Sequence, residues 1–586
     1  MQKKDFLVGL LVTLCLCPPV FAEKFTGKCG ENTTYSFDTE TKTLTISGTG
    51  SISLQEGENV APWTNYRDSI RTIVVEDGVG LPEYDCFNWC YQVEKPVYNS
   101  TTFYYVAPDY IRNHPDFLPE GRKYIAPYAV YSFTNVNLNT LSIPEGYEEI
   151  GDYAFQFTEI RQVSLPESMK RLGMSAFNNC SIQTINIPEA LEYAGSYSFF
   201  CNNINIALYN EKTFFYLPSN TETERYTIPG NPERIASTAF ANNYQLIEVN
   251  IPASVKEIGD GAFQNCEALT NIILPDGLES IGNEAFYRCE ALTSIILPDG
   301  LESIGNEAFY RCEALASITL PDNISFIGKG VFNFCENLQE AILPTNLKTV
   351  PENMFNSCRN LQKIVLPESL DSIGAYAFEN CNKLTDLNIP KSIVYIGPYA
   401  INAANLTPSE PLYTSKVFIR MPTDYAGEYT VPEGIDCIYN EAFYNCDHLT
   451  AVHLPNSIKQ INPTAFYNCS ITDIELPQGV EICENAFTNS SLTSIEIPEG
   501  TSTINGWAFS NSPLKEVILP EGLVSIGMGA FYNCDSLTSI IFPSTLTQIG
   551  DLKSEAGAFE NCDKLQSITI PASISILGNR AFSGCI

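Results

Sequence analysis

The segment LTNIILPDGLESIGNEAFYRCEA, residues 269–291, is followed at once by LTSIILPDGLESIGNEAFYRCEA, residues 292–314. The two copies are 23 residues long and differ only at Asn271 against Ser294. A unit of about 20–29 residues with regularly spaced apolar positions is typical of one coil of a solenoid. Because one coil cannot bury its apolar side alone, stacking on a similar coil supplies the core. The duplication therefore predicts an array of stacked coils.

The same frame, L-x-x-I-x-L-P-x-x-L-x-x-I-G-x-x-A-F-x-x-C, runs from about Leu138 to the end of the chain. Its x-I-x-L part, as in Ser294–Leu297, alternates like a strand with one buried face, so stacked coils would form a parallel sheet. Pro298 would end the strand, and Gly305 would make a tight bend with positive φ. The NEAFYRC part, 306–312, would make a short helical turn. The leading leucine recurs at a spacing of 23 residues at Leu269, Leu292, Leu315, Leu338, Leu361 and Leu384.

This pattern resembles the BspA-like leucine-rich repeat family, and so does the segment GKCGENTTYSFDTETKTLTISGTGSI, 27–52, with Pro62 and Trp63 after it. The resemblance implies an α/β-type solenoid, which is a β-dominated leucine-rich repeat superhelix. A stacked parallel sheet would line its concave face, short helical or irregular turns the other side, and a small β-rich cap the amino end. Members that resemble this chain are exported proteins of host-associated bacteria and some protist parasites. Several are implicated in binding host matrix proteins, host cells or other microbes.

Residues 1–22 are predicted to be an export signal. Lys3 and Lys4 form a basic start, Phe6–Leu16 is apolar, and 20–22 offers a small-residue cleavage site. The rival interpretation, a membrane anchor, requires about 20 apolar residues, more than this stretch has. We therefore expect a secreted or cell-surface protein without an integral membrane segment.

Four regions follow from these patterns. After the signal, 23–80 would form the β-rich cap, 81–137 a degenerate repeat with a hairpin excursion, and 138–586 the solenoid. Two more excursions, about 202–235 and 402–435, delay the next repeat phenylalanine. Each excursion is interpreted as a β-hairpin at the edge of the solenoid, which either binds a partner or packs locally.

Acidic residues outnumber basic ones 68 to 33, for a net charge of −35. Nucleic-acid binding needs clustered Lys and Arg, so this balance argues against it. There are only three histidines, and no P-loop, Rossmann, zinc-protease or hydrolase motif occurs in its proper context. The sequence therefore predicts a protein that is not an enzyme and has no catalytic residues, cofactor or metal site.

The chain has twenty cysteines, and most of them occupy the F-x-x-C position. Stacked coils would point these thiols inward in parallel, which favours buried free thiols over disulfides and gives no tetrahedral zinc cluster. Six other cysteines could include one or two disulfides: Cys29, Cys86, Cys90, Cys201, Cys437 and Cys483.

Two surface sets are candidate binding residues. The strand position four residues after the leading leucine gives a β-branched column, which is either an exposed docking surface or a packing stripe within the sheet; its residues are Ile273, Ile296, Thr319, Ile342 and Val365. Further along, the same face carries negative charge, which either attracts a basic ligand or is simply solvated; its residues are Asp473, Glu475, Glu496 and Glu516.

These observations favour an exported recognition protein that binds a protein or glycan surface through the concave sheet and the excursions. The main alternative is a structural spacer or cell-envelope component without a specific ligand. A carbohydrate-active or protease activity hidden in the array is a third, less favoured, hypothesis.

Overall fold

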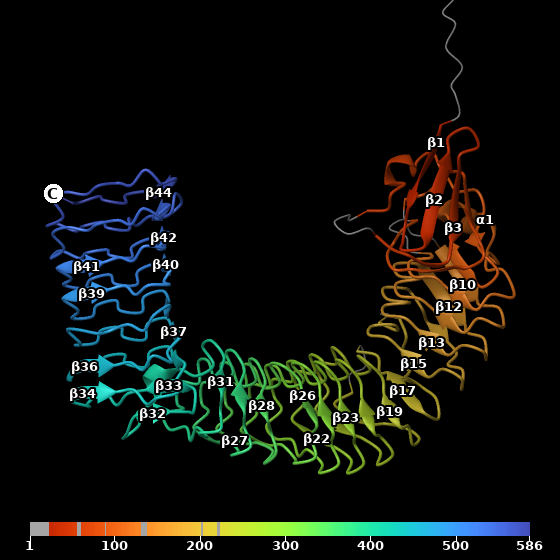
Figure 1. Cartoon of the computed structure of the whole chain (residues 1–586). Coiled ribbons are helices and arrows are strands. Elements are labelled where there is room, and N and C mark those ends of the chain that lie inside the picture. The colour runs from red at the N-terminus through yellow and green to blue at the C-terminus, as the bar shows by residue number, and fades with distance from the viewer. Residues whose placement is uncertain are drawn as a thin grey trace, which may run out of the picture. The chain divides into compact units, whose positions relative to one another are not determined.

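The protein is a β-solenoid of stacked parallel strands with almost no helix (Figure 1). The computed structural model describes residues 23–54, 60–87, 89–130, 137–200, 203–219 and 223–585. The predicted export signal, 1–22, and Cys201 lie outside the described residues. The chain divides into two compact units, 1–210 and 211–586.

The first unit begins with a small β-rich cap. In one sheet β1, β2 and β3 pair antiparallel and β5 joins β3 in parallel, while β4 and β6 form a second, parallel pair. Trp63 is buried beneath the cap, where its indole Nε1 donates to the Cys86 carbonyl at 2.8 Å and its ring stacks on Phe87 at 5.8 Å. The elements are β1 (Lys24–Lys28), β2 (Thr33–Asp38), β3 (Thr43–Gly48), β4 (Gly50–Ile52), a 3-10 turn (Thr64–Tyr66), β5 (Thr72–Val75) and β6 (Val79–Pro82).

A hairpin leads from the cap to the first coils. Strands β7 and β8 pair antiparallel, and β8 then pairs in parallel with β9 of the coil array. Asn99 shapes the hairpin turn, because its Oδ1 accepts the backbone N–H groups of Thr101 and Thr102. The remaining elements of this unit are β7 (Val97–Tyr98), β8 (Thr102–Tyr105), α1 (Pro108–Asn113), β9 (Tyr124–Ile125), β10 (Asn137–Ser142), β11 (Glu149–Ile150), β12 (Glu159–Ser164), β13 (Arg171–Leu172), β14 (Thr184–Ile185), β15 (Tyr193–Ala194) and β16 (Leu208–Tyr209).

In the second unit the x-I-x-L segments form what we call the first ladder. Its parallel sheets have the orders β18-β20-β22, β25-β27-β29, β34-β36 and β39-β41. The alternation predicted for Ser294–Leu297 is present, with Ile295 and Leu297 buried, but this segment is not a strand. The strands are β18 (Arg225–Thr227), β20 (Glu248–Asn250), β22 (Asn271–Ile273), β25 (Ser317–Thr319), β27 (Glu340–Ile342), β29 (Lys363–Val365), β34 (Gly427–Thr430), β36 (Leu449–His453), β39 (Ser494–Glu496) and β41 (Glu516–Ile518).

A second ladder, which the sequence pattern did not reveal, uses the x-I that precedes the repeat glycine. In Figure 1 the two ladders lie at opposite sides of the coils, most clearly in the blue part, where β39 and β41 face away from β40 and β42. The antiparallel hairpin of β32 (Leu412–Tyr413) and β33 starts the last of its sheets. Its strands before that hairpin are β17 (Thr213–Tyr216), β19 (Arg234–Ile235), β21 (Glu257–Ile258), β23 (Ser280–Ile281), β24 (Ser303–Ile304), β26 (Phe326–Ile327), β28 (Thr349–Val350), β30 (Ser372–Ile373) and β31 (Tyr395–Ile396).

The last part of the second ladder is a continuous parallel series in the order β33-β35-β37-β38-β40-β42-β43-β44. A 3-10 turn, Ala403–Asn405, comes before the hairpin in sequence. The strands are β33 (Val417–Arg420), β35 (Cys437–Ile438), β37 (Gln460–Ile461), β38 (Glu481–Ile482), β40 (Thr503–Ile504), β42 (Ser525–Ile526), β43 (Gln548–Ile549) and β44 (Ile576–Leu577).

Between the ladders the repeat phenylalanines form a column of stacked rings. Phe309 is fully buried, and its ring centroid lies 5.2 Å from that of Phe286 and 5.5 Å from that of Phe332, with nearly parallel planes. Offset stacking at these distances adds to the free energy gained from burying the rings. Where the column is continuous, it therefore packs each coil against both of its neighbours.

Two predictions for the repeat turn were wrong. The 306–312 segment is not helical; it is a series of turns with two left-handed residues, Glu307 at φ 53° and Arg311 at φ 57°. Gly305 does not have positive φ. It is required for another reason: a Cβ at this position would lie 2.4 Å from the backbone nitrogen of Asn283 in the preceding coil. The glycine is a point of close approach between coils, not a bend.

The repeat cysteines of the central coils, from Cys266 to Cys381, are free and buried. In the run from Cys266 to Cys381 each thiol donates to a phenylalanine carbonyl of the preceding coil, as Cys312 does to Phe286 at 3.3 Å, whereas Cys446 and Cys469 donate to the carbonyls of Tyr444 and Cys446. Burial raises the pKa of the Cys266 thiol to about 12, so the thiol is neutral at physiological pH. Among the residues that the structure describes, Cys29, Cys86, Cys90, Cys437 and Cys483 are free as well.

Replacing Cys312 by serine is expected to lower the unfolding free energy by less than about 1 kcal/mol, because a hydroxyl can donate in the same place. Ser512 occupies the equivalent position of another coil, and its hydroxyl donates to the Phe487 carbonyl of the preceding coil at 3.2 Å. Cys312→Ala, which removes the donor, should cost about 1 kcal/mol more than Cys312→Ser. Urea unfolding of the two variants measures the difference. An equal cost would show that the thiol only fills space.

Candidate recognition surface

The predicted apolar column lies on the outward side of the first ladder. Its residues are among the most exposed large apolar side chains of the described chain, at 69% for Ile273, 84% for Ile296, 50% for Ile342 and 63% for Val365. Thr319 occupies the same position in β25 and is exposed. The alternating neighbours, such as Ile272 and Ile318, are buried in the core. We call these five outward residues the apolar column.

The strand pairing explains why the column is in register. Asn250 pairs with Ile273 across β20 and β22, and Thr319, Ile342 and Val365 pair across β25, β27 and β29. Ile296 lies in the segment between β22 and β25 that is not a strand. An ion pair between Lys363 and Glu340 runs along the same face beside the column.

The column position continues beyond the five predicted residues. Ile518, at the end of β41, and Ile541 lie four residues after the leading leucine of their coils, as the column residues do, and are exposed as well. The repeat frame contained this signal, since the same position could have been followed to the end of the array. The outward apolar surface therefore recurs in the last coils.

The four predicted carboxylates come together in one depression of about 460 Å³. Asp473 and Glu475 come from one coil, Glu496 ends β39 and Glu516 begins β41. Glu499, which was not predicted, lines the same depression. No ion pair within the described residues involves these five side chains. The site is thus strongly negative and fits a basic group better than an anion.

Within the described ranges, no three His, Cys, Asp or Glu side chains are grouped so that they could hold a metal ion. Of the helices in the described part of the chain, none has the length and apolar character needed to cross a bilayer.

Stacked coils with an L-x-x-I-x-L strand, a buried phenylalanine column and two parallel ladders define a leucine-rich repeat solenoid. The profile of the BspA type leucine-rich repeat region, in six copies, matches residues 128–214, 210–328, 279–407, 423–485 and 459–586. The chain belongs to this family. Leucine-rich repeat proteins mediate protein interactions, and their fold is typically non-enzymatic.

Solved structures with similar sequences include three bacterial proteins. A leucine-rich repeat protein from Bacteroides ovatus is 28% identical over 62% of this chain and 85% of its own, with a TM-score of 0.38. A leucine rich cell surface protein from Faecalibacterium prausnitzii is 26% identical over 64% and 92%, with a TM-score of 0.38. The leucine-rich repeat protein of T. pallidum is 30% identical over 30% and 83%, with a TM-score of 0.28. None of the curated proteins compared with the chain matches it.

Proposed function

We propose that this protein is an exported adhesin that binds a macromolecular partner, a protein or glycan on host matrix, host cells or another microbe, through the outward side of the first ladder. The observation that carries the proposal is the apolar column, whose isoleucines are half to more than four-fifths exposed. Exposed apolar side chains aligned in a row mark interaction surfaces, because leaving them in water is unfavourable.

Two further features support this function. The signal-like residues 1–22 favour export, which would bring the column to an extracellular partner. The hairpins β7–β8 and β32–β33 interrupt the regular coils and add surface beside them. A stiff spacer without a ligand is the alternative, and the binding experiment below separates the two.

Replacing both Ile296 and Ile342 by aspartate is expected to weaken partner binding at least about 30-fold, which corresponds to the roughly 2 kcal/mol of an interface hot spot. Charges placed in an apolar contact must be desolvated without a partner. Binding of the full chain to immobilised extracellular-matrix proteins and to whole cells, measured by surface plasmon resonance and flow cytometry, tests this.

The matched control places the same charges at the second ladder, on Phe326 in β26 and on Val524 directly before β42, which are also exposed. Phe326→Asp with Val524→Asp should leave binding unchanged. Should adhesion survive the change at Ile296 and Ile342, the column is not the site. A wild-type chain that binds none of the surfaces, yet folds normally after deletion of residues 292–314, would favour the spacer.

A further inference from the structure

The second ladder is interrupted between β31 and β33. Strand β31 is the last of its sheet, and the hairpin of β32 and β33 opens the next one. The phenylalanine column is interrupted at the same place, because Ile401 stands where the repeat has phenylalanine. Tyr439 bridges the interruption: its buried hydroxyl donates to the Gly397 carbonyl at 2.8 Å and accepts the Ile401 N–H at 3.2 Å. The coils there are held together without regular stacking.

A depression of about 450 Å³ lies at this interruption. One wall is aromatic and apolar: Tyr395 is 55% exposed, Tyr399 is 46% exposed, and Val394 lies beside them. Tyr399 is held in place by stacking on Tyr376, with ring centroids 5.7 Å apart. Exposed tyrosines offer a flat apolar face together with a polar rim. Such a face suits a ring with C–H bonds on one side and hydroxyls at its edge.

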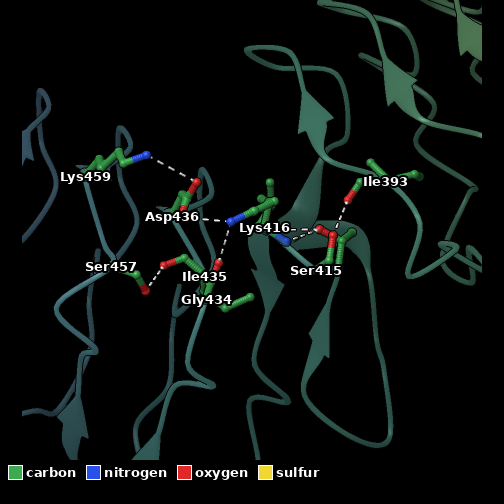
Figure 2. Close-up of polar contacts among 10 residues, drawn as sticks. Ile393, Ser415, Lys416, Gly434, Ile435, Asp436, Ser457 and Lys459 are labelled. Atoms are coloured by element: carbon green, nitrogen blue, oxygen red, sulfur yellow. Dashed lines mark hydrogen bonds and ion pairs between the residues drawn. The ribbon is translucent and has the colours of Figure 1, made fainter.

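The lining also carries two ammonium groups that share one carboxylate. Lys416 Nζ lies 3.5 Å from Asp436 Oδ1, and Lys459 Nζ lies 3.4 Å from Asp436 Oδ2 (Figure 2). Lys416 also donates to the Gly434 carbonyl at 3.3 Å. Each ammonium has three donors, so both lysines have hydrogen-bonding capacity left for an anion. Lys416, Lys459 and Asp436 are the charged residues among those that line the depression, so the lining carries one net positive charge.

Amide side chains complete the lining. Gln460 donates to Glu481 at 3.0 Å, which fixes its orientation at the edge of the depression. Asn440 is only 5% exposed, and its Oδ1 has no hydrogen-bond partner. Because this oxygen has almost no accessible surface, Asn440 contributes to the shape of the lining and not to direct contact with a ligand.

We propose that this depression binds an anionic saccharide, a sugar ring that carries a carboxylate. The ring would stack on Tyr395 and Tyr399, and its carboxylate would accept hydrogen bonds from the remaining ammonium donors of Lys416 and Lys459. The acidic depression at Asp473 and its neighbours has nearly the same volume but only negative charges, so it would repel the same ligand. The proposed site is distinct from the apolar column and does not depend on it.

The probe is a hyaluronan hexasaccharide, which carries a carboxylate on every second ring; cellohexaose is the neutral comparison. Isothermal titration calorimetry of the full chain should show binding of hyaluronan at least tenfold tighter than of cellohexaose. Lys459→Met should reduce the affinity for hyaluronan about tenfold and leave cellohexaose unaffected, since Lys459 is 77% exposed and contributes charge rather than packing. Tyr395→Ala should weaken both saccharides.

The control variant is Lys348→Met, because this lysine is similarly exposed and is also beside an aspartate, Asp371, but lies outside the depression. It should bind hyaluronan as the wild type does, and Lys459→Arg should retain most of the affinity. Three results would overturn the proposal: no hyaluronan binding at millimolar concentration, equal binding by Lys459→Met, or tighter binding of hexaglutamate, which would make the ligand an acidic peptide. The Ile296 and Ile342 double variant should keep hyaluronan binding, so the two proposals fail separately.

Discussion

Replacing Phe309 by alanine is expected to lower the unfolding free energy by about 3–5 kcal/mol, the range found for buried aromatic residues cut back to alanine. The ring is fully buried and stacked at 5.2 Å and 5.5 Å between two others of the column. A cavity here removes packing from three coils at once. Since each coil of a repeat protein is stabilised mainly by its neighbours, the loss should also loosen the adjacent coils.

Urea unfolding followed by circular dichroism measures this effect, and hydrogen exchange shows how far it spreads. Tyr310→Ala is the matched control in the same coil: Tyr310 is half-buried and stacks on Tyr287 at 4.8 Å, outside the column. It should cost about 1 kcal/mol. Similar losses for both variants would mean that the column contributes no more than any other aromatic pair.

The repeat frame was enough to predict the stacking and the outward column. A strict period places equivalent residues in register, so the burial of Ile272 and the exposure of Ile273 follow from alternation alone. The second ladder was missed because nearly all of its strands are only two residues long, as in Ser303–Ile304, too short for any alternation to be seen.

The depression at the interruption could not be predicted, for a different reason. Its walls come from coils on both sides of an insertion, and Tyr395 and Lys459 are 64 positions apart (459 − 395) in units with no unusual composition. The only signal in the sequence was Ile401 in place of phenylalanine. That substitution marks where the regular stack fails, but it does not tell which side chains gather there.

The prediction for the repeat glycine was wrong because a glycine can be required either for positive φ or for a close approach of two backbones. The sequence does not distinguish these two reasons. Positive φ belongs instead to the position two residues later, where Glu284 has φ 53° and other coils have Gly261 and Gly330. A left-handed turn can be made by several residue types, as Glu284 and Glu307 show. A close approach of two backbones admits no side chain at all.

The second large effect is therefore expected at Gly282. An added Cβ would lie 2.6 Å from the Asp260 backbone nitrogen and 2.7 Å from the Gly259 carbonyl carbon, and neither can move without shifting the preceding coil. Gly282→Ala should lower the unfolding free energy by about 3 kcal/mol, at the upper end of the cost of overpacking. The Gly282 N–H donates to the Ile258 carbonyl at 2.8 Å, so the second ladder would be strained as well.

Gly277→Ala in the same 23-residue copy is the control and should have the opposite sign. The nearest atom to its added Cβ is the Ala253 carbonyl oxygen at 3.7 Å, an ordinary contact, and its φ is not positive. Alanine there should raise the unfolding free energy by about 0.4–1 kcal/mol, because it restricts the unfolded chain. Urea unfolding of the two variants measures both changes in the unfolding free energy. If both alanines are neutral, the coils can separate without cost, and close backbone contact is not what makes the repeat require glycine.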